Sequence, residues 1–180
     1  MNRAEMVELI RGGVPGAGGV WADLGAGTGN FTEALRELLG AQGAIYAVDR
    51  DGKAIRAQHE LLAQAGPGAS VFPIQADITQ RLTLPPLDGV LVANALHFIR
   101  DQAAALALIA SYLRPSGRLL IVEYDLAEPL RWVPFPVPFT RFQALAEGAG
   151  LHNPAHVGSR VSPSSGVAMY AGVAIRQIAG

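Results

Sequence analysis

Short apolar runs alternate with segments of helical periodicity along most of this chain. Buried strands are expected at five mainly apolar runs, at 20–24, 44–48, 70–75, 88–93 and 118–124. Apolar residues spaced near 3.6 positions predict helices at 3–11, 30–40, 51–65 and 101–113. This alternation predicts an α/β fold with a mainly parallel sheet and helices on both of its faces.

The pattern changes after the fifth predicted strand. Residues 126–139 hold four prolines among Trp132, Phe135 and Phe139, and proline excludes a regular helix or a central strand. Three regular elements are expected after this segment, namely a helix at 139–149 and strands at 155–161 and 167–176. Because no repeat or second domain is visible, we predict that residues 1–180 form a single domain.

The stretch from Val20 to Thr32, VWADLGAGTGNFT, carries the strongest chemical signal. An apolar strand ends in three alternate glycines, and a helix follows. Glycine accepts positive φ and lets a ligand approach the N–H groups at a helix start. A dinucleotide-binding G-x-G-x-x-G turn would need glycine at Asn30, and a phosphate-binding P-loop would need a lysine. Asp23, two residues before the first glycine, suits a cationic amine better than a pyrophosphate.

Two further aspartates come directly after predicted strands. Asp49 ends the second strand, about 20 residues after the glycine turn, where a carboxylate can accept from both hydroxyls of a ribose. The alternative role of helix N-cap suits Asp51 better. Asp77 follows the third strand, where turn chemistry is its alternative role. Because the carboxyl ends of parallel strands share one edge of the sheet, we expect a nucleoside ligand at that edge.

The sequence D-L-G-A-G-T-G, with aspartates at positions 49 and 77, resembles the first motifs of class I S-adenosylmethionine-dependent methyltransferases. The resemblance implies a Rossmann-like seven-stranded sheet in the order 3-2-1-4-5-7-6, with the last strand antiparallel. It also implies S-adenosylmethionine as the cofactor, with the glycine turn at its methionine moiety and Asp77 at the amine of adenine. The cofactor-binding residues that it implies are Asp23, Gly25, Ala26, Gly27, Thr28, Gly29, Asp49, Arg50, Asp77, Ile78, Asn94 and Ala95.

Residues Asn94–Phe98 match the family's fourth motif, which lies beside the reactive methyl group. Methyl transfer from a sulfonium is an in-line displacement with a neutral leaving group, so we predict no metal. An oxygen or carbon acceptor also needs a base. His97 is the candidate, and a packed histidine is its alternative. His152 and His156 are four residues apart, but Asn153-Pro154 between them argues against a helical zinc pair.

Composition and motifs limit the range of possible methyl acceptors. The chain has no cysteine, Lys53 is its only lysine, and Asn94–His97 lacks an Asn-Pro-Pro pattern. By resemblance, these features disfavour methylation of cytosine C5, ribose 2′-hydroxyl and adenine N6. A net charge of −1 supplies no basic surplus for nucleic acid. A small, partly apolar acceptor is therefore predicted.

Hydrophobic residues make up 50% of the chain and charged residues 16%, which is typical of a globular protein. The start lacks the apolar core of a signal peptide, and no apolar run approaches the roughly 20 residues that cross a bilayer. We therefore predict a cytoplasmic protein without membrane contact. The apolar segment 126–139 either lines the acceptor pocket or packs on the core or on a partner subunit of a homodimer.

Two other functions stay open at this point. Only residues 1–19 precede the first predicted strand, so the amino-terminal cap of many family members is expected to be minimal. That feature favours a non-catalytic S-adenosylmethionine-binding subunit or sensor. The second alternative is an NAD-dependent oxidoreductase, which Asn30 in place of glycine disfavours.

Overall fold

Strands and helices alternate through most of the computed structural model, which describes residues 1–177; the last residues of the predicted domain, 178–180, lie outside it. The helices are α1 (Arg3–Arg11), α2 (Asn30–Leu39), α3 (Gly52–Ala63), α4 (Gln102–Tyr112) and α5 (Phe139–Gly148). The strands are β1 (Gly19–Leu24), β2 (Gly43–Asp49), β3 (Ser70–Gln75), β4 (Leu87–Ala93), β5 (Leu113–Tyr124), β6 (Leu151–Val161) and β7 (Ala168–Arg176). Two 3-10 turns, η1 (Gly40–Gln42) and η2 (Leu96–Phe98), follow α2 and β4.

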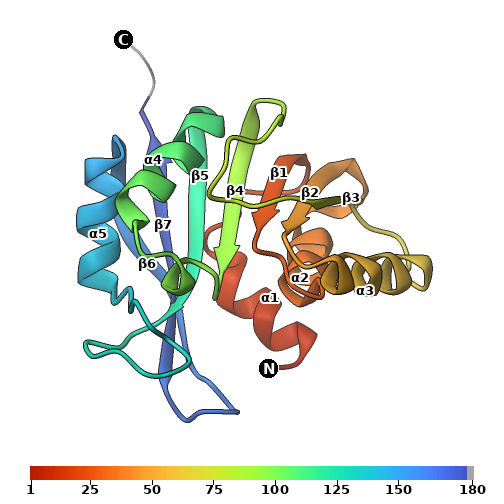
Figure 1. The fold of residues 1–180 in the computed structure, drawn as a ribbon. Coiled ribbons are helices and arrows are strands. Elements are labelled where there is room, and N and C mark those ends of the chain that lie inside the picture. The colour runs from red at the N-terminus through yellow and green to blue at the C-terminus, as the bar shows by residue number, and fades with distance from the viewer. Residues whose placement is uncertain (178–180) are drawn as a thin grey trace.

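The strands form one sheet in the order β3-β2-β1-β4-β5-β7-β6 (Figure 1). Strands β1 to β5 pair with one another in parallel, and β7 is antiparallel to both β5 and β6. The predicted order and the antiparallel final strand are confirmed. The order reverses between β1 and β4, so the carboxyl ends of these two strands flank the topological switch point.

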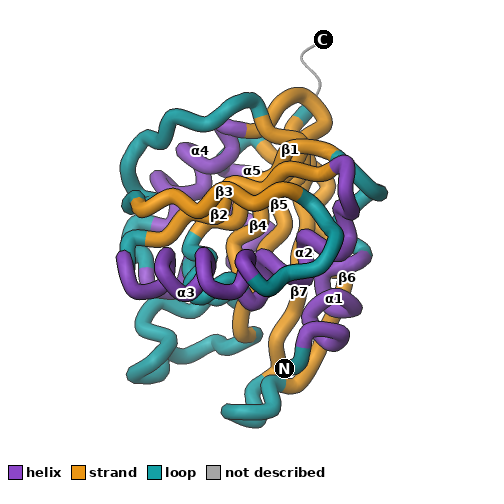
Figure 2. Tube along the Cα trace, turned by 90° about the vertical axis from the view of Figure 1, so that its right-hand side faces the viewer, coloured by secondary structure: helices purple, strands orange, loops and turns teal. Residues whose placement is uncertain are grey.

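Successive residues along each strand face opposite sides of the sheet. In β1, Trp21 packs in a core cluster with residues of α1 and α2, whereas Ala22 packs in a second cluster with residues of α4 and α5. Figure 2 shows α1, α2 and α3 on one side of the strands and α4 and α5 on the other. The predicted helices on both faces are therefore confirmed.

Strand β5 begins at Leu113, earlier than the predicted start at residue 118. The turn signal Arg114–Gly117 lies inside the strand, where Ser116 adopts a φ of 63° and the pairing with β4 shifts register between Leu87 and Gly89. Leu113 is buried and pairs with Leu87, so its burial outweighs the local turn preference.

Strand β6 likewise begins at Leu151, earlier than the predicted start at residue 155. Asn153 has a φ of 54°, and the register shifts between His152 and Ala155, so the Asn-Pro pair forms an irregularity within the strand. Leu151 is fully buried and pairs with Arg176. Among the helices of the described residues, none is long and apolar enough to cross a membrane.

Candidate active site

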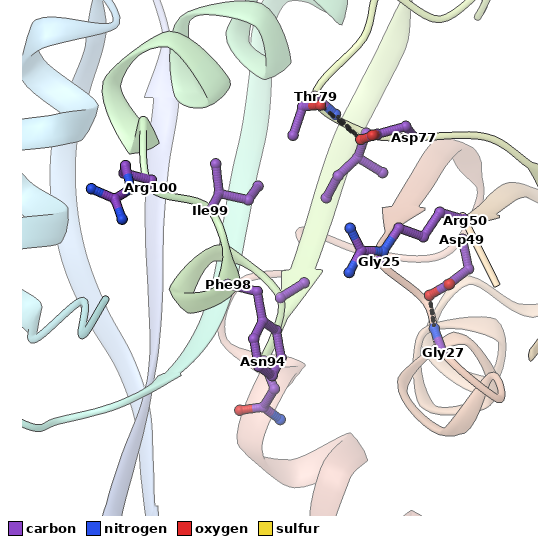
Figure 3. A pocket seen from close by; sticks show the side chains of 12 residues that line it. Gly25, Gly27, Asp49, Arg50, Asp77, Thr79, Asn94, Phe98, Ile99 and Arg100 are labelled. Atoms are coloured by element: carbon purple, nitrogen blue, oxygen red, sulfur yellow. Dashed lines mark hydrogen bonds between the residues drawn. The ribbon is translucent and has the colours of Figure 1, made fainter. Parts of the chain in front are cut away.

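A cavity of about 470 Å³ opens at the carboxyl ends of β1 to β4 (Figure 3). It is lined by Gly25, Gly27, Asp49, Arg50, Asp77, Ile78, Thr79, Asn94, Ala95, Phe98, Ile99 and Arg100. This volume suits a small ligand. The position is the predicted one, but four of the predicted cofactor-binding residues are not in its lining, namely Asp23, Ala26, Thr28 and Gly29.

Hydrogen bonds from the glycine turn, residues 25–29, to residues of β2 and α3 hold the turn in place. The N–H groups of Gly25 and Ala26 both donate to the carbonyl of Val48, at 2.9 and 3.0 Å. Gly25 has a φ of 78°, and a Cβ there would lie 2.5 Å from the Cβ of Ala95, so only glycine fits. The Gln58 side chain donates to the Gly27 carbonyl at 2.7 Å. Sequence reasoning missed Gln58 because a glutamine within a helix carries no local signal.

Asp49 stands beside this turn with both carboxylate oxygens engaged. Its Oδ2 accepts from the Gly27 N–H at 2.8 Å, and its Oδ1 accepts from the Asp51 N–H at 2.9 Å. Asp51 caps α3 by accepting from the Lys53 N–H at 2.8 Å, as predicted. The carboxylate of Asp49 is thus held at the cavity wall, and its contact with a ribose stays a prediction.

Asp77 forms a local turn and also lines the cavity. Its Oδ1 accepts from the N–H and the hydroxyl of Thr79, at 2.9 and 2.8 Å. These two bonds, together with the nearby charge of Arg50, hold the pKa of Asp77 below its usual 3.8, so the group is ionised at neutral pH. The Asp-x-Thr spacing is the signal that could have identified Thr79.

Asp23 lies beneath the glycine turn and is fully buried. Its Oδ2 accepts from the Thr32 hydroxyl at 2.6 Å, and its Oδ1 has no hydrogen-bond partner among the described residues. Burial raises the pKa of Asp23 from 3.8 to about 7; the Thr32 hydroxyl lowers it and the charge of Asp49 raises it further. The predicted contact between Asp23 and a cationic amine stays a prediction.

Asn94 follows β4 with a φ of 52°, which is unusual for a residue other than glycine. Its N–H donates to the Val122 carbonyl at 2.8 Å. Its side chain lines the cavity, yet the buried Oδ1 has no partner within residues 1–177. Leaving a buried acceptor unpaired costs about 1–3 kcal/mol, so this oxygen suits a ligand that carries an N–H or O–H donor.

His97 lies behind the cavity wall rather than in it. Only 2% of the residue is exposed, and its Nδ1 lies 2.6 Å from Oε2 of the fully buried Glu123. The His97 backbone N–H also donates to Oε1 of Glu123, at 3.2 Å. The next residue, Phe98, does line the cavity. The catalytic role of His97 stays a prediction. Glu123 was missed, although a single acidic residue in the apolar run RLLIVEY is a signal for a buried partner.

The segment 126–138, which we call the strap, connects β5 to α5. Val133 and Val137 are fully buried, and the Tyr170 hydroxyl donates to the Val137 carbonyl at 2.7 Å. The Phe135 N–H donates to the His97 carbonyl at 3.1 Å. No strap residue is in the cavity lining, so the strap packs on the protein's own core beside the cavity.

The two histidines spaced four residues apart, His152 and His156, lie on β6. The ring of His156 packs near the rings of Phe139 and Tyr170, with centroids 5.4 and 6.0 Å away. Within residues 1–177 we find no cluster of three histidine, cysteine, aspartate or glutamate residues arranged to hold a metal ion.

Comparison with known proteins identifies a family. The family model described as "Methyltransferase domain" matches residues 17–147. The ubiquinone/menaquinone biosynthesis C-methyltransferase UbiE of Marinomonas sp. (strain MWYL1) is 30% identical over 114 residues, which are 62% of this chain and 45% of that protein. The chain therefore spans less than half the length of this curated relative.

Solved structures share the fold. The N-methyltransferase NodS from Bradyrhizobium japonicum WM9, in complex with S-adenosyl-L-homocysteine, superposes with a TM-score of 0.78 at 21% identity, over 97% of this chain and 86% of that chain. The [4+2]-cyclase SpnF gives a TM-score of 0.77 at 14% identity, over 98% and 81% of the two chains, so the fold alone does not define the reaction. The family match and the glycine turn do confirm the resemblance: the chain belongs to the class I S-adenosylmethionine-dependent methyltransferase family.

Proposed function

We propose that this protein transfers a methyl group from S-adenosylmethionine to a small, partly apolar acceptor. The observation that carries the proposal is the cavity at the switch point, where the glycine turn, Asp49 and the unpartnered Asn94 oxygen meet. The acceptor atom forms a bond to the methyl carbon while the carbon–sulfur bond breaks, and the electron pair stays on sulfur. Holding the acceptor in line supplies much of the rate acceleration.

The groups around the cavity fit this cofactor. A carboxylate at Asp49 can accept from ribose hydroxyls, and an ionised Asp77 can accept from the amine of adenine. The unpartnered oxygens of Asn94 and Asp23 are acceptors suited to an ammonium group. When bound, S-adenosylmethionine would supply an electrophilic methyl group on a sulfonium.

His97 is proposed as the base for an acceptor that must lose a proton. Because a carboxylate only accepts, the contact with Glu123 assigns the proton of the neutral imidazole to Nδ1 and leaves Nε2 free to accept. Glu123 therefore acts as a positioning residue for His97. As a base, His97 would take the proton of the acceptor at Nε2.

We further propose that residues 1–180 act as one cytoplasmic methyltransferase domain that does not bind nucleic acid. The net charge of −1 supports the absence of nucleic-acid binding. A homodimer stays a prediction. The comparisons with known proteins give no support to the sensor or to the NAD-dependent oxidoreductase.

The first test is ligand binding. S-adenosylhomocysteine should bind with a Kd on the order of micromolar and raise the melting temperature at saturation, because it binds only the folded state. Calorimetry and thermal shift would measure both, with NAD as the comparison. A rise in melting temperature with NAD, and none with S-adenosylmethionine or S-adenosylhomocysteine, would refute the proposal.

The second test follows a screen of small phenols, amines and carboxylates with detection of S-adenosylhomocysteine. His97→Ala should lower turnover by about 10²–10⁴-fold and leave cofactor affinity nearly intact. His59→Ala, on the exposed face of α3, is the matched control. If His97→Ala kept full turnover between about pH 6 and pH 9, His97 would not be the base.

A further inference from the structure

The cavity has two unlike walls (Figure 3). Asp49, Arg50 and Asp77 line one side and present charged groups to it. Phe98 and Ile99 line the opposite side, and neither has a polar side-chain atom. The charged wall matches the hydrogen-bonding groups of the nucleoside part of the cofactor. The apolar wall is therefore available to the methyl acceptor.

Phe98 is a large apolar side chain that stays 58% exposed at this wall. Its ring is held against His97, with a centroid distance of 4.3 Å, and His97 is in turn held by Glu123. An exposed but supported aromatic ring offers a fixed π face on which a flat ligand can stack without ordering a mobile side chain.

Contacts between aromatic rings continue from Phe98 toward the strap. The ring centroids of His97 and Tyr124 are 6.0 Å apart, and those of Tyr124 and Trp132 are 4.7 Å apart in an edge-to-face arrangement. Trp132 is 40% exposed. We call Phe98, His97, Tyr124 and Trp132 the aromatic run; its two outer members are exposed, and His97 between them is buried.

The strap connects Trp132, at the outer end of the aromatic run, to His97, which supports Phe98. Leu130 and Val133 exchange backbone hydrogen bonds of 3.0 and 2.9 Å, which close a tight turn with Trp132 inside it. The Phe135 N–H then ties the strap to the His97 carbonyl. Trp132 and Phe98 are therefore positioned by one framework centred on His97.

We infer that the cavity selects a planar aromatic acceptor, with Phe98, held in place by the aromatic run, as the residue that determines this specificity. The inference rests on the proposed function, since it names the acceptor class for the same cavity. Stacking on an aromatic face adds affinity beyond burial of apolar area, so a flat ring should be preferred over a saturated ring of similar size.

The test compares two probes, 2-naphthol and trans-decahydro-2-naphthol, by calorimetry on protein saturated with S-adenosylhomocysteine. The bound nucleoside keeps the probes out of the nucleoside side of the cavity. 2-Naphthol should bind about three- to tenfold more tightly.

Phe98→Leu separates stacking from apolar contact, because leucine keeps an apolar side chain and removes the π face. This variant should bring the two affinities within about twofold of each other. Phe72→Leu is the matched control, since Phe72 is 48% exposed on β3 and is absent from the cavity lining.

Equal affinities for the two naphthyl-sized probes, or a preference that survives Phe98→Leu, would overturn the inference. The thermal shift with S-adenosylhomocysteine is a separate experiment, and the absence of a shift would refute the proposed function. In that case the binding of the two probes would be compared on the protein without nucleoside, and the same difference in affinity is expected.

Discussion

Two fully buried carboxylates lie near the carboxyl ends of two strands, Asp23 in β1 and Glu123 in β5. Strand β4 lies between these two strands in the sheet. Both oxygens of Glu123 have partners, the Nδ1 and the backbone N–H of His97. Within residues 1–177, only one oxygen of Asp23 has a partner, the Thr32 hydroxyl. Burial raises the pKa of Asp23 to about 7, because desolvation of the charged form is only partly offset.

The difference separates a structural carboxylate from one poised to respond to a ligand. Glu123 joins β5 to the η2 turn and thereby supports Phe98, so its contacts lie within the protein. Asp23 keeps an unused acceptor beneath the glycine turn, so a proton or a bound cation can still improve its contacts. Substitutions at these carboxylates and their partners test this contrast.

The largest effect is expected for Glu123→Ala. The variant leaves two buried N–H donors of His97 without acceptors, so the free energy of unfolding should fall by about 3–5 kcal/mol. Urea denaturation would measure the change. Glu128→Ala, on the exposed part of the strap, should change stability by less than about 0.5 kcal/mol. A loss below about 1 kcal/mol for Glu123→Ala would show that Glu123 is not structural in this sense.

Asp23 should make folding stability depend on pH. Between about pH 4 and pH 7 the unfolded carboxyl has lost its proton while the folded one keeps it, so the folded state binds more protons. Stability from this group is therefore greatest below pH 4 and falls as the pH rises through 7, by no more than about 4 kcal/mol. Asp23→Asn should remove that decline in urea unfolding followed across pH. An unchanged decline in the variant would assign it to other groups.

Asp49 provides a third carboxylate, at the cavity wall, for comparison with the two buried ones. Asp49→Ala should weaken S-adenosylhomocysteine binding by about 2–3 kcal/mol, because charge-assisted hydrogen bonds to the ribose would be lost. Calorimetry would measure the affinity. The control is Asp51→Ala, which removes only the cap of α3 and should leave affinity nearly unchanged. Unchanged affinity in Asp49→Ala would show that the ribose is held elsewhere.

The smallest effect is expected for Thr32→Val, which removes the hydroxyl that donates to the side chain of Asp23. Loss of one hydrogen bond to the charged form should move the Asp23 titration upward by about one pH unit. Carboxyl NMR on the folded protein would follow the titration. A downward shift would contradict the account of the Asp23 pKa given above.

The βα alternation and the glycine turn could be predicted from the sequence. So could the Asp51 cap and the positions of Asp49 and Asp77 at the cavity. These features depend on residues close together in the chain: a strand, a turn and a helix start need only a few neighbouring positions to be specified. The strand order came from the family resemblance, and the pairing of β3-β2-β1-β4-β5-β7-β6 confirms it.

The surroundings of His97, the early starts of β5 and β6, and the position of the strap depend on contacts between distant parts of the chain. Glu123 lies 26 positions from His97, so neither residue's local pattern shows that they touch. Leu113 and Leu151 extend their strands because partners far along the chain bury them, against local turn signals. Burial and pairing depend on which distant segments meet, and that information resides in the packed fold rather than in any short stretch of sequence.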